Sequence, residues 1–242
     1  MNTISTIQNY PASGKLSQAI NTLKQAARDW DEAERSQGQV DRYLDSTEQN
    51  FRDAEYPARN ASFDNAQRDS SWDGRELERH FRSGERNIDS SQFKLGDADR
   101  SLERTTNGID SGQYTLEQLA DEYRDAGDPR LDDIRSAQEA LNSSEQSFGQ
   151  VEWGWNSAGS SLRFTQSDVS QAQWDIREIS SDRPGRDVSI YGSRVSSKIN
   201  SIQGDLRMIE TDMYRARSNG DSGEDLLDRA IAILEDAARN EP

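Results

Sequence analysis

Bulky apolar residues recur every seven positions along three stretches of the chain, and a small residue follows most of them three positions later. In the first stretch, for example, Leu16 is followed by Ala19. A seven-residue repeat held over such a length predicts helices that wrap around one another. The small residues predict that these helices lie unusually close together. The three stretches run from 16 to 54, from 81 to 109 and from 134 to 179.

The composition also suits a narrow apolar seam. Only 31% of the residues are hydrophobic, 31% are charged, and the mean hydropathy is −1.04. Such a chain cannot fill a wide globular core, but a thin bundle needs only one apolar stripe per helix. Intrinsic disorder is the competing interpretation, and the sustained repeat argues against it for residues 14–218. We therefore predict an all-α fold, an elongated antiparallel bundle of about four long coiled-coil-like helices plus short ones.

Proline and glycine predict where the helices begin and end. Pro57 separates the first two helices, because proline lacks the amide hydrogen that a helix interior requires; a single helix kinked at Pro57 is the alternative. Gly108 and Gly112 mark one break, and Asn219-Gly220 marks another. A three-helix rod with 186–240 packed separately is the alternative architecture. The predicted bundle, 14–240, follows a flexible N-terminus, 1–13, and contains helices at about 14–55, 57–107, 115–126, 129–180, 187–218 and 223–239.

Some seam positions carry unusual residues. Trp30 and Trp155 occupy bulky positions and are expected in the core. Gln37 falls in the same series, and a single buried polar residue can fix the register of packed helices. Gly84 and Gly192 each cost about 1 kcal/mol of helix propensity, so their presence on the seam predicts close backbone contact.

One short segment resembles another. Residues 46–51 (STEQNF) match residues 143–148 (SSEQSF) at four of the six positions. Such an echo can be a relic of duplicated hairpins. The similarity decays on either side, however, and the predicted helix boundaries do not coincide. We interpret the echo as convergence on one solution to the heptad pattern.

The sequence offers little catalytic or metal-binding chemistry. The absence of cysteine excludes disulfides and thiolate sites. His80, the only histidine, is flanked by charged residues and is expected on a helix surface rather than in a hydrolase triad. A di-iron bundle site uses two Glu-x-x-His pairs, and this sequence has none. We therefore expect no enzymatic activity, no cofactor and no metal site.

The charge of the chain restricts its partners. The formal net charge of −16 argues against binding to a nucleic-acid backbone, which requires clustered lysine and arginine. It argues equally against binding to anionic membrane surfaces. The longest apolar run, 230–234, is far too short to cross a bilayer. We expect no nucleic-acid partner and no membrane insertion.

Three tryptophans lie off the predicted apolar stripe and are the candidate partner contacts: Trp72, Trp153 and Trp174. Exposed tryptophans often mark the sites where proteins contact each other. The alternative is structural, because a helix in a bundle buries two faces and an off-stripe tryptophan can fill a second groove.

These observations favour a non-enzymatic helical rod, cytoplasmic and structural or protein-interacting, that binds a protein partner or associates with itself. Two other functions stay open. The Ser-, Thr-, Asn- and Ile-rich residues 1–15 resemble the composition of non-cleaved bacterial export signals, which suggests a factor delivered by a non-Sec route to act on other cells. The acidity of the chain suggests a mimic of nucleic acid that occupies a basic partner.

Overall fold

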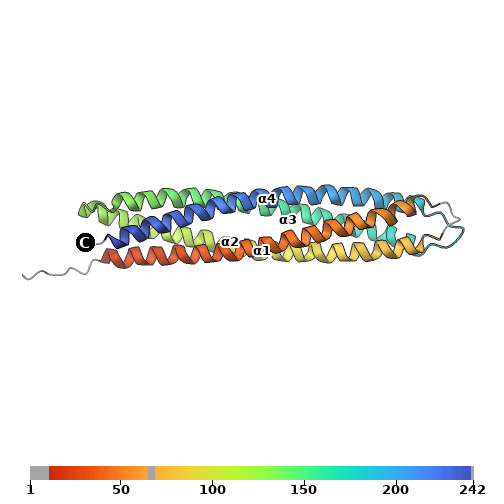
Figure 1. Ribbon diagram of the computed structural model, residues 1–242, viewed down its shortest axis with the longest axis horizontal. Coiled ribbons are helices and arrows are strands. Elements are labelled where there is room, and N and C mark those ends of the chain that lie inside the picture. The colour runs from red at the N-terminus through yellow and green to blue at the C-terminus, as the bar shows by residue number, and fades with distance from the viewer. Residues whose placement is uncertain (1–10, 65–68, 241–242) are drawn as a thin grey trace, which may run out of the picture. The chain divides into compact units, whose positions relative to one another are not determined.

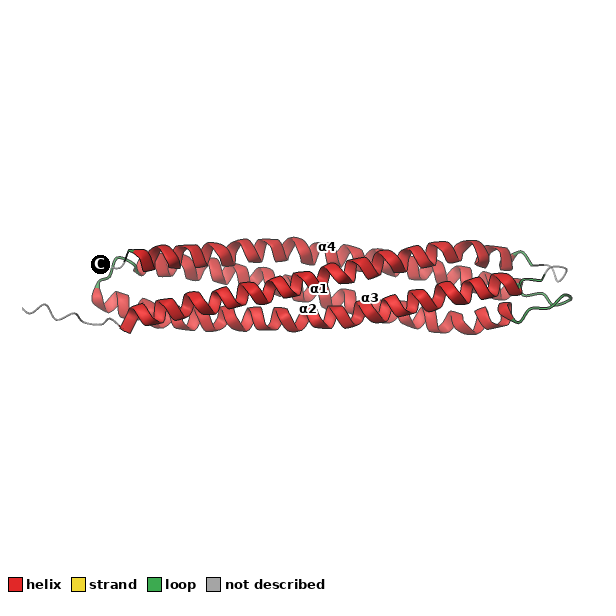
Figure 2. Ribbon diagram, turned by 60° about the horizontal axis from the view of Figure 1, so that its bottom comes forward, coloured by secondary structure: helices red, strands yellow, loops and turns green. Residues whose placement is uncertain are grey.

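The chain folds as an all-α bundle of four long helices, as the sequence predicts. The computed structural model describes residues 11–64 and 69–240, and these ranges contain no strand (Figure 2). The helices are α1 (Pro11–Ser62), α2 (Ser71–Ala126), α3 (Leu131–Ser180) and α4 (Ser189–Arg239).

The four helices pass through two compact units, and each unit contains a segment of every helix (Figure 1). The first unit comprises Met1–Ala33, Arg100–Val151 and Ser218–Pro242, and the second comprises Glu34–Asp99 and Glu152–Arg217. Because α4 contributes to both units, the alternative of a three-helix rod with a separate C-terminal segment is wrong.

Three predicted helix boundaries are wrong. Pro57 lies inside α1, Gly108 and Gly112 lie inside α2, and Asn219-Gly220 lies inside α4. The helix α3 begins two residues later than predicted. The predicted N-terminal segment 1–13 lies outside the described residues, except that 11–13 belong to α1. The helices predicted at about 14–55, 57–107, 115–126, 187–218 and 223–239 therefore merge into α1, α2 and α4.

Packing carries α1 through Pro57. Phe51 and Ala54 before the proline, and Ala58 and Ala61 after it, are fully buried, so the apolar seam continues across it. A proline inside a helix costs about 3 kcal/mol, whereas burying one large apolar side chain contributes roughly 1.5–3 kcal/mol. The sum over the seam outweighs the local cost, and the chain reverses only after Ser62.

Two glycines of α4, of which Gly220 suggested a helix break, receive side chains from facing helices. In the first unit, a Cβ atom added at Gly220 would lie 2.4 Å from the Trp30 ring, and one added at Gly223 would lie 2.9 Å from the Phe148 ring. The Trp30 and Phe148 rings pack on each other with centroids 4.8 Å apart. Glycine at these positions makes room for two large aromatic residues in a core that has little other volume.

The predicted core tryptophans are confirmed, since Trp30 and Trp155 are only 1% and 2% exposed. Gln37 is buried as well, and its Nε2 donates a hydrogen bond of 3.0 Å to the carbonyl oxygen of Met213. The side chain therefore ties α1 to α4 within the second unit.

The two seam glycines differ in what they contact. A Cβ atom at Gly192 would lie 2.3 Å from the backbone nitrogen of Ser62, so the prediction of close backbone contact is confirmed there. At Gly84 the nearest atoms belong to the ring of Phe51. Gly84 is therefore a socket for an aromatic side chain rather than a point of backbone contact.

Two aspartates join the helix connections of the second unit. The carboxylate of Asp64, after α1, accepts a hydrogen bond of 2.9 Å from the backbone N–H of Val188, before α4. Conversely, the carboxylate of Asp182, after α3, accepts one of 2.8 Å from the backbone N–H of Ser70, before α2. Both aspartates are buried, so each connection satisfies a buried donor of the other.

In these reciprocal contacts, each residue of the α1–α2 hairpin has a counterpart in the α3–α4 hairpin at a constant distance in sequence. Asp64 and Asp182 are 118 positions apart, and so are Ser70 and Val188. The same offset relates two further pairs of hydrogen bonds that cross between the hairpins. In the second unit, Gln203 donates to Glu55 and Gln173 donates to Glu85; in the first, Thr105 donates to the Ala26 carbonyl and Ser144 to the Gly223 carbonyl.

Each of these bonds thus has a counterpart at the same offset. The segments 46–51 and 143–148, whose sequences echo each other, are 97 positions apart instead. The echo therefore pairs positions that are not equivalent in the structure.

Candidate interaction surface

Large exposed hydrophobic side chains gather on the second unit. Among the described residues, ten of the eleven that are mainly exposed belong to it, and Tyr114 is the one in the first unit. Such residues on a polar surface are typical of contact sites. The ten are Tyr56, Phe63, Trp72, Phe93, Trp153, Phe164, Trp174, Ile190, Met208 and Tyr214.

All three tryptophans that the sequence singled out are exposed. Trp72, Trp153 and Trp174 have relative exposures of 56%, 64% and 54%. The alternative, in which they fill a second groove of the bundle, is therefore wrong. Their role as partner contacts stays a prediction.

Trp174 lies near the end of α3, close to the start of α4. Its ring meets the ring of Tyr191 edge to face, with centroids 5.3 Å apart. The guanidinium groups of Arg186 and Arg194 lie 5.9 Å and 6.0 Å from the centre of the Tyr191 ring. Ile190 is exposed next to Tyr191. We call these five residues the Trp174 corner.

The local fold explains how the corner is held. Gly185, with φ of 100°, lets the chain turn sharply between α3 and α4. Asp187 accepts a hydrogen bond of 2.9 Å from the Ser189 amide and so caps the start of α4. Arg186 reaches back to form an ion pair with Glu178 of α3. These contacts fix the backbone on both sides of the aromatic pair.

The arginines at the corner are more exposed than its acidic residues, although the two kinds are equal in number. Residues 174–194 contain four arginines and four acidic residues, but two of the acids, Asp175 and Asp182, are buried. Burial raises the pKa of the Asp175 carboxyl, and Arg194, whose Nη1 lies 3.6 Å from it, acts in the opposite direction. The corner therefore presents aromatic and guanidinium groups, which are enriched where proteins bind each other.

A groove between α2 and α3 in the second unit is the first alternative site. It has a volume of about 220 Å³ and lies over Leu95 and Trp155. At the offset of 118 positions, the corresponding place between α1 and α4 holds the ion pair of Arg217 and Asp41. In the groove between α2 and α3, Gly159 lies opposite Leu95 instead. The polar groups at its rim are amides, a carboxylate and a guanidinium. They include no pair of nucleophile and base of the kind that catalysis requires.

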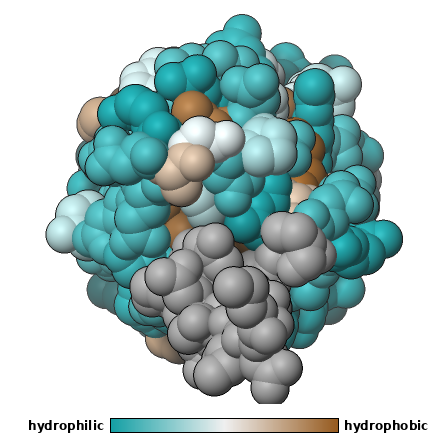
Figure 3. All heavy atoms as spheres, turned by 90° about the vertical axis from the view of Figure 1, so that its left-hand side faces the viewer, coloured by the Kyte–Doolittle hydropathy of each residue, from teal (hydrophilic) through white to brown (hydrophobic). Residues whose placement is uncertain are grey.

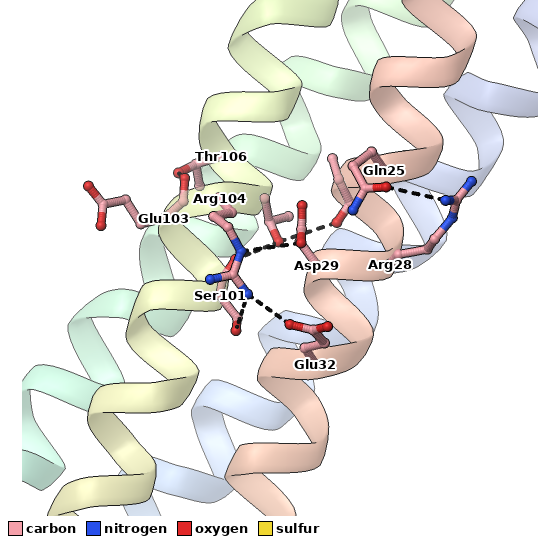
Figure 4. Close-up of polar contacts among 10 residues, drawn as sticks. Gln25, Arg28, Asp29, Glu32, Ser101, Glu103, Arg104 and Thr106 are labelled. Atoms are coloured by element: carbon pink, nitrogen blue, oxygen red, sulfur yellow. Dashed lines mark hydrogen bonds and ion pairs between the residues drawn. The ribbon is translucent and has the colours of Figure 1, made fainter.

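A second alternative lies between α1 and α2 in the first unit, where polar residues line a shallow groove of about 760 Å³. Figure 4 shows that Arg104 reaches from α2 towards α1, where it pairs with Asp29 at 3.3 Å and Glu32 at 2.8 Å. It also donates to Ser101 on its own helix. Because the guanidinium already has three oxygen partners, this cluster joins two helices rather than awaiting a ligand.

His80, which the sequence places on a helix surface, lies on α2 and is partly buried. Its side chain is 14% exposed, and Nε2 lies 3.8 Å from a carboxylate oxygen of Glu76. Burial and the neighbouring Arg79 lower its pKa. Within residues 11–64 and 69–240, no group of three or more acidic or histidine side chains is placed to hold a metal ion. No helix in that part of the chain is long and apolar enough to span a membrane.

Comparison with known proteins finds no matching family model, no similar curated protein and no similar solved structure.

Sequence reasoning identified Trp174 but missed its neighbours. Arg186 lies in a segment predicted only as a turn, and Tyr191 and Arg194 lie between seam positions of α4. A usable signal was present, since one aromatic and four arginines within 177–194 stand out in an acidic chain. The end of α3 was predicted at residue 180, as observed, but heptad periodicity does not show which exposed side chains of α3 and α4 contact each other.

Proposed function

We propose that this chain is a non-enzymatic protein-interaction element, a helical bundle that binds a protein partner through the Trp174 corner. One observation carries the proposal: Trp174, Tyr191 and two arginines form one cluster where α3 ends and α4 begins, with Trp174 and Arg194 exposed. Tryptophan, tyrosine and arginine dominate the binding energy of protein interfaces. Such groups are most effective when the scaffold already holds them in place, because less side-chain entropy is lost on binding.

The rest of the bundle supports this role through rigidity. The seam residues are buried, and the connections between helices are tied by Asp64 and Asp182. A contact surface on such a scaffold keeps its geometry between the free and bound states.

Site-specific photocrosslinking tests the proposal. A photoreactive amino acid is placed at position 190, which precedes Tyr191 in the sequence, or at position 208 on α4, where Met208 is also exposed. In an extract of the source organism, position 190 is expected to give a discrete crosslinked product that Trp174→Ala abolishes. Position 208 is the control and is expected to give none. Equal crosslinking from both positions, or none from 190, contradicts the proposal.

A further inference from the structure

The two hairpin connections of the second unit repeat one sequence pattern. Residues 59–74, where α1 ends and α2 begins, match residues 177–192, where α3 ends and α4 begins, at seven of sixteen positions. The spacing is the same offset of 118 positions that relates the hydrogen bonds between the hairpins. The identical residues are Arg59, Ser62, Asp64, Arg68, Asp69, Ser71 and Gly74, with Arg177, Ser180, Asp182, Arg186, Asp187, Ser189 and Gly192 as their counterparts.

The repeated residues at the helix starts make the same contacts. Asp69 accepts a hydrogen bond of 2.9 Å from the Ser71 amide and caps α2. Asp187 accepts one of the same length from the Ser189 amide and caps α4. The two helices therefore begin in the same way.

The repeated glycines contact the opposite hairpin reciprocally. A Cβ atom added at Gly74 of α2 would collide with the backbone of Ser180 at the end of α3. A Cβ atom added at Gly192 of α4 would collide with the backbone of Ser62 at the end of α1. Sequence and contacts together show that the α1–α2 and α3–α4 hairpins are two versions of one structural unit.

Exposed apolar side chains recur beside these connections. Tyr56 occupies the position of Trp174, six residues before its helix ends, and both are exposed. Trp72 occupies the position of Ile190, the second residue of its helix, and both are exposed as well. The other six exposed apolar residues of the second unit have polar, charged or glycine counterparts. These six are Phe63, Phe93, Trp153, Phe164, Met208 and Tyr214, and their counterparts are Ser181, Thr211, Arg35, Ser46, Ser90 and Gly96.

Packing explains why buried apolar residues recur, but it does not explain recurrence on the surface. A large apolar side chain exposed to water gains little from the fold, and such residues are typical of contact sites. The connection between α2 and α3 offers a comparison. Figure 3 views the end of the molecule where this connection lies, and the surface it shows is mainly hydrophilic. Recurrent exposure beside the other two connections therefore indicates a shared contact role.

We propose that Tyr56 and Trp72, with Arg59, form a second contact site for the partner of the Trp174 corner, so that one chain binds two copies of one partner protein. The inference rests on the proposed function and adds its stoichiometry. The same partner fits both sites because the main groups recur: an aromatic ring at 56 and 174, a large apolar side chain at 72 and 190, and an exposed arginine at 59 and 177.

The differences between the sites predict which one is weaker. Tyr191 and Arg194 of the Trp174 corner correspond to Asp73 and Glu76 in the α1–α2 hairpin. Asp73 is buried, so the second site has no counterpart of the aromatic ring that packs against Trp174. It holds fewer of the groups that dominate the binding energy of interfaces. We expect the partner to bind there more weakly than at the Trp174 corner.

Photocrosslinking of the full chain in an extract of the source organism tests the proposal. A photoreactive amino acid at position 72, the counterpart of 190, is expected to give a product with the same added mass as position 190, in lower yield. Position 93 is the control, since Phe93 is equally exposed on the same helix but its counterpart is Thr211. A product of different mass from position 72, or equal products from 72 and 93, overturns the proposal.

Variants show whether the two sites are separate. Tyr56→Ala is expected to reduce the product from position 72 by about 10-fold, the effect of losing one interface contact, and to leave the product from 190 unchanged. Trp174→Ala is expected to do the reverse. Circular dichroism establishes that both variants stay helical. A product from position 72 that depends on Trp174 and not on Tyr56 shows a single site and overturns the proposal.

The stoichiometry is measured on a chain with the photoreactive amino acid at both 72 and 190. This chain is expected to give a product that carries the added mass twice. A chain that never gains more than one added mass overturns the proposal.

The failure of this inference differs from the failure of the proposed function. If position 190 gives a product and position 72 gives none, the Trp174 corner binds its partner and the second site does not exist. If neither position gives a product, the proposed function fails together with the second site.

Discussion

The carboxylate of Asp64 accepts a hydrogen bond of 2.9 Å from the backbone amide of Val188, a residue 124 positions away in the sequence. Val188 is fully buried, so no solvent replaces this acceptor. The contact therefore ties the connection after α1 to the start of α4. It explains how a bundle with a thin core keeps its helix ends in place.

Removing that acceptor is expected to destabilise the fold. Asp64→Ala leaves a buried N–H without a partner, which costs about 1–3 kcal/mol. Asp64→Asn keeps a side-chain oxygen and is expected to recover more than half of the loss. Urea unfolding at neutral pH measures both variants. An Ala variant as stable as the parent shows that the bond contributes nothing.

Two glycine substitutions on α4 are expected to have opposite signs. Gly204→Ala places a methyl group where no atom lies within 4 Å, so it gains roughly 0.5–1 kcal/mol of helix propensity. Gly220→Ala gains the same propensity but pushes a methyl group to 2.4 Å from the Trp30 ring. Overpacking of this kind costs about 1–3 kcal/mol. Thermal unfolding of the two variants checks the prediction. If Gly220→Ala stabilises the chain, Gly220 is not needed to make room for the Trp30 ring.

Replacing Gln37 by leucine is expected to raise stability. The Nε2 of Gln37 donates to the Met213 carbonyl, but its Oε1 is buried without a hydrogen-bond partner. Burying an unsatisfied polar atom costs about 1–3 kcal/mol, and leucine of similar size fills the site without that cost. We expect a gain of about 1 kcal/mol by urea unfolding. A loss of stability or a change in oligomeric state shows that Gln37 fixes the register of α1 and α4.

The stability of the bundle is expected to depend on Glu210. Burial, and then the neighbouring Glu48 and Asp45, raise the pKa of Glu210 above its ordinary value of 4.5. The folded state therefore holds this proton more tightly than the unfolded state, so the group's destabilising effect is absent below pH 4.5 and develops as the pH rises through the folded pKa. Glu210→Gln removes the effect.

We expect Glu210→Gln to raise the free energy of unfolding at pH 7 by roughly 0.5 kcal/mol, since exposed charges interact weakly. The difference from the parent chain is expected to vanish below about pH 4.5. Glu139→Gln, an exposed glutamate on α3, is the control. A Glu210→Gln variant whose advantage persists at low pH contradicts this assignment.

Much of the fold follows from the heptad repeat. The repeat predicts the all-α bundle and the burial of Trp30, Trp155 and Gln37, because residues seven apart lie on one helix face whatever the partner helix is. The same pattern showed that Trp72, Trp153 and Trp174 lie off that face. All three are exposed in the structure.

The helix ends could not be predicted in the same way. Gly220 has the local character of a break, but Trp30 from another helix fills the space above it. Pro57 likewise stays helical because its neighbours are buried. In each case packing with segments far away in the sequence outweighs the local preference. The Trp174 corner was incompletely predicted for a different reason, since the heptad pattern identifies buried positions but not the contact between Tyr191 and Trp174.

The account depends most on Trp174 being the residue through which the chain makes contact. Nitrogen-15 NMR of the indole N–H groups reports on all five tryptophans separately while an extract of the source organism is added. The account predicts that the Trp174 resonance shifts or broadens on addition of the extract, whereas Trp153, Trp30 and Trp155 stay unchanged. A Trp174 resonance that is indifferent to the extract, while that of Trp153 moves, would contradict it.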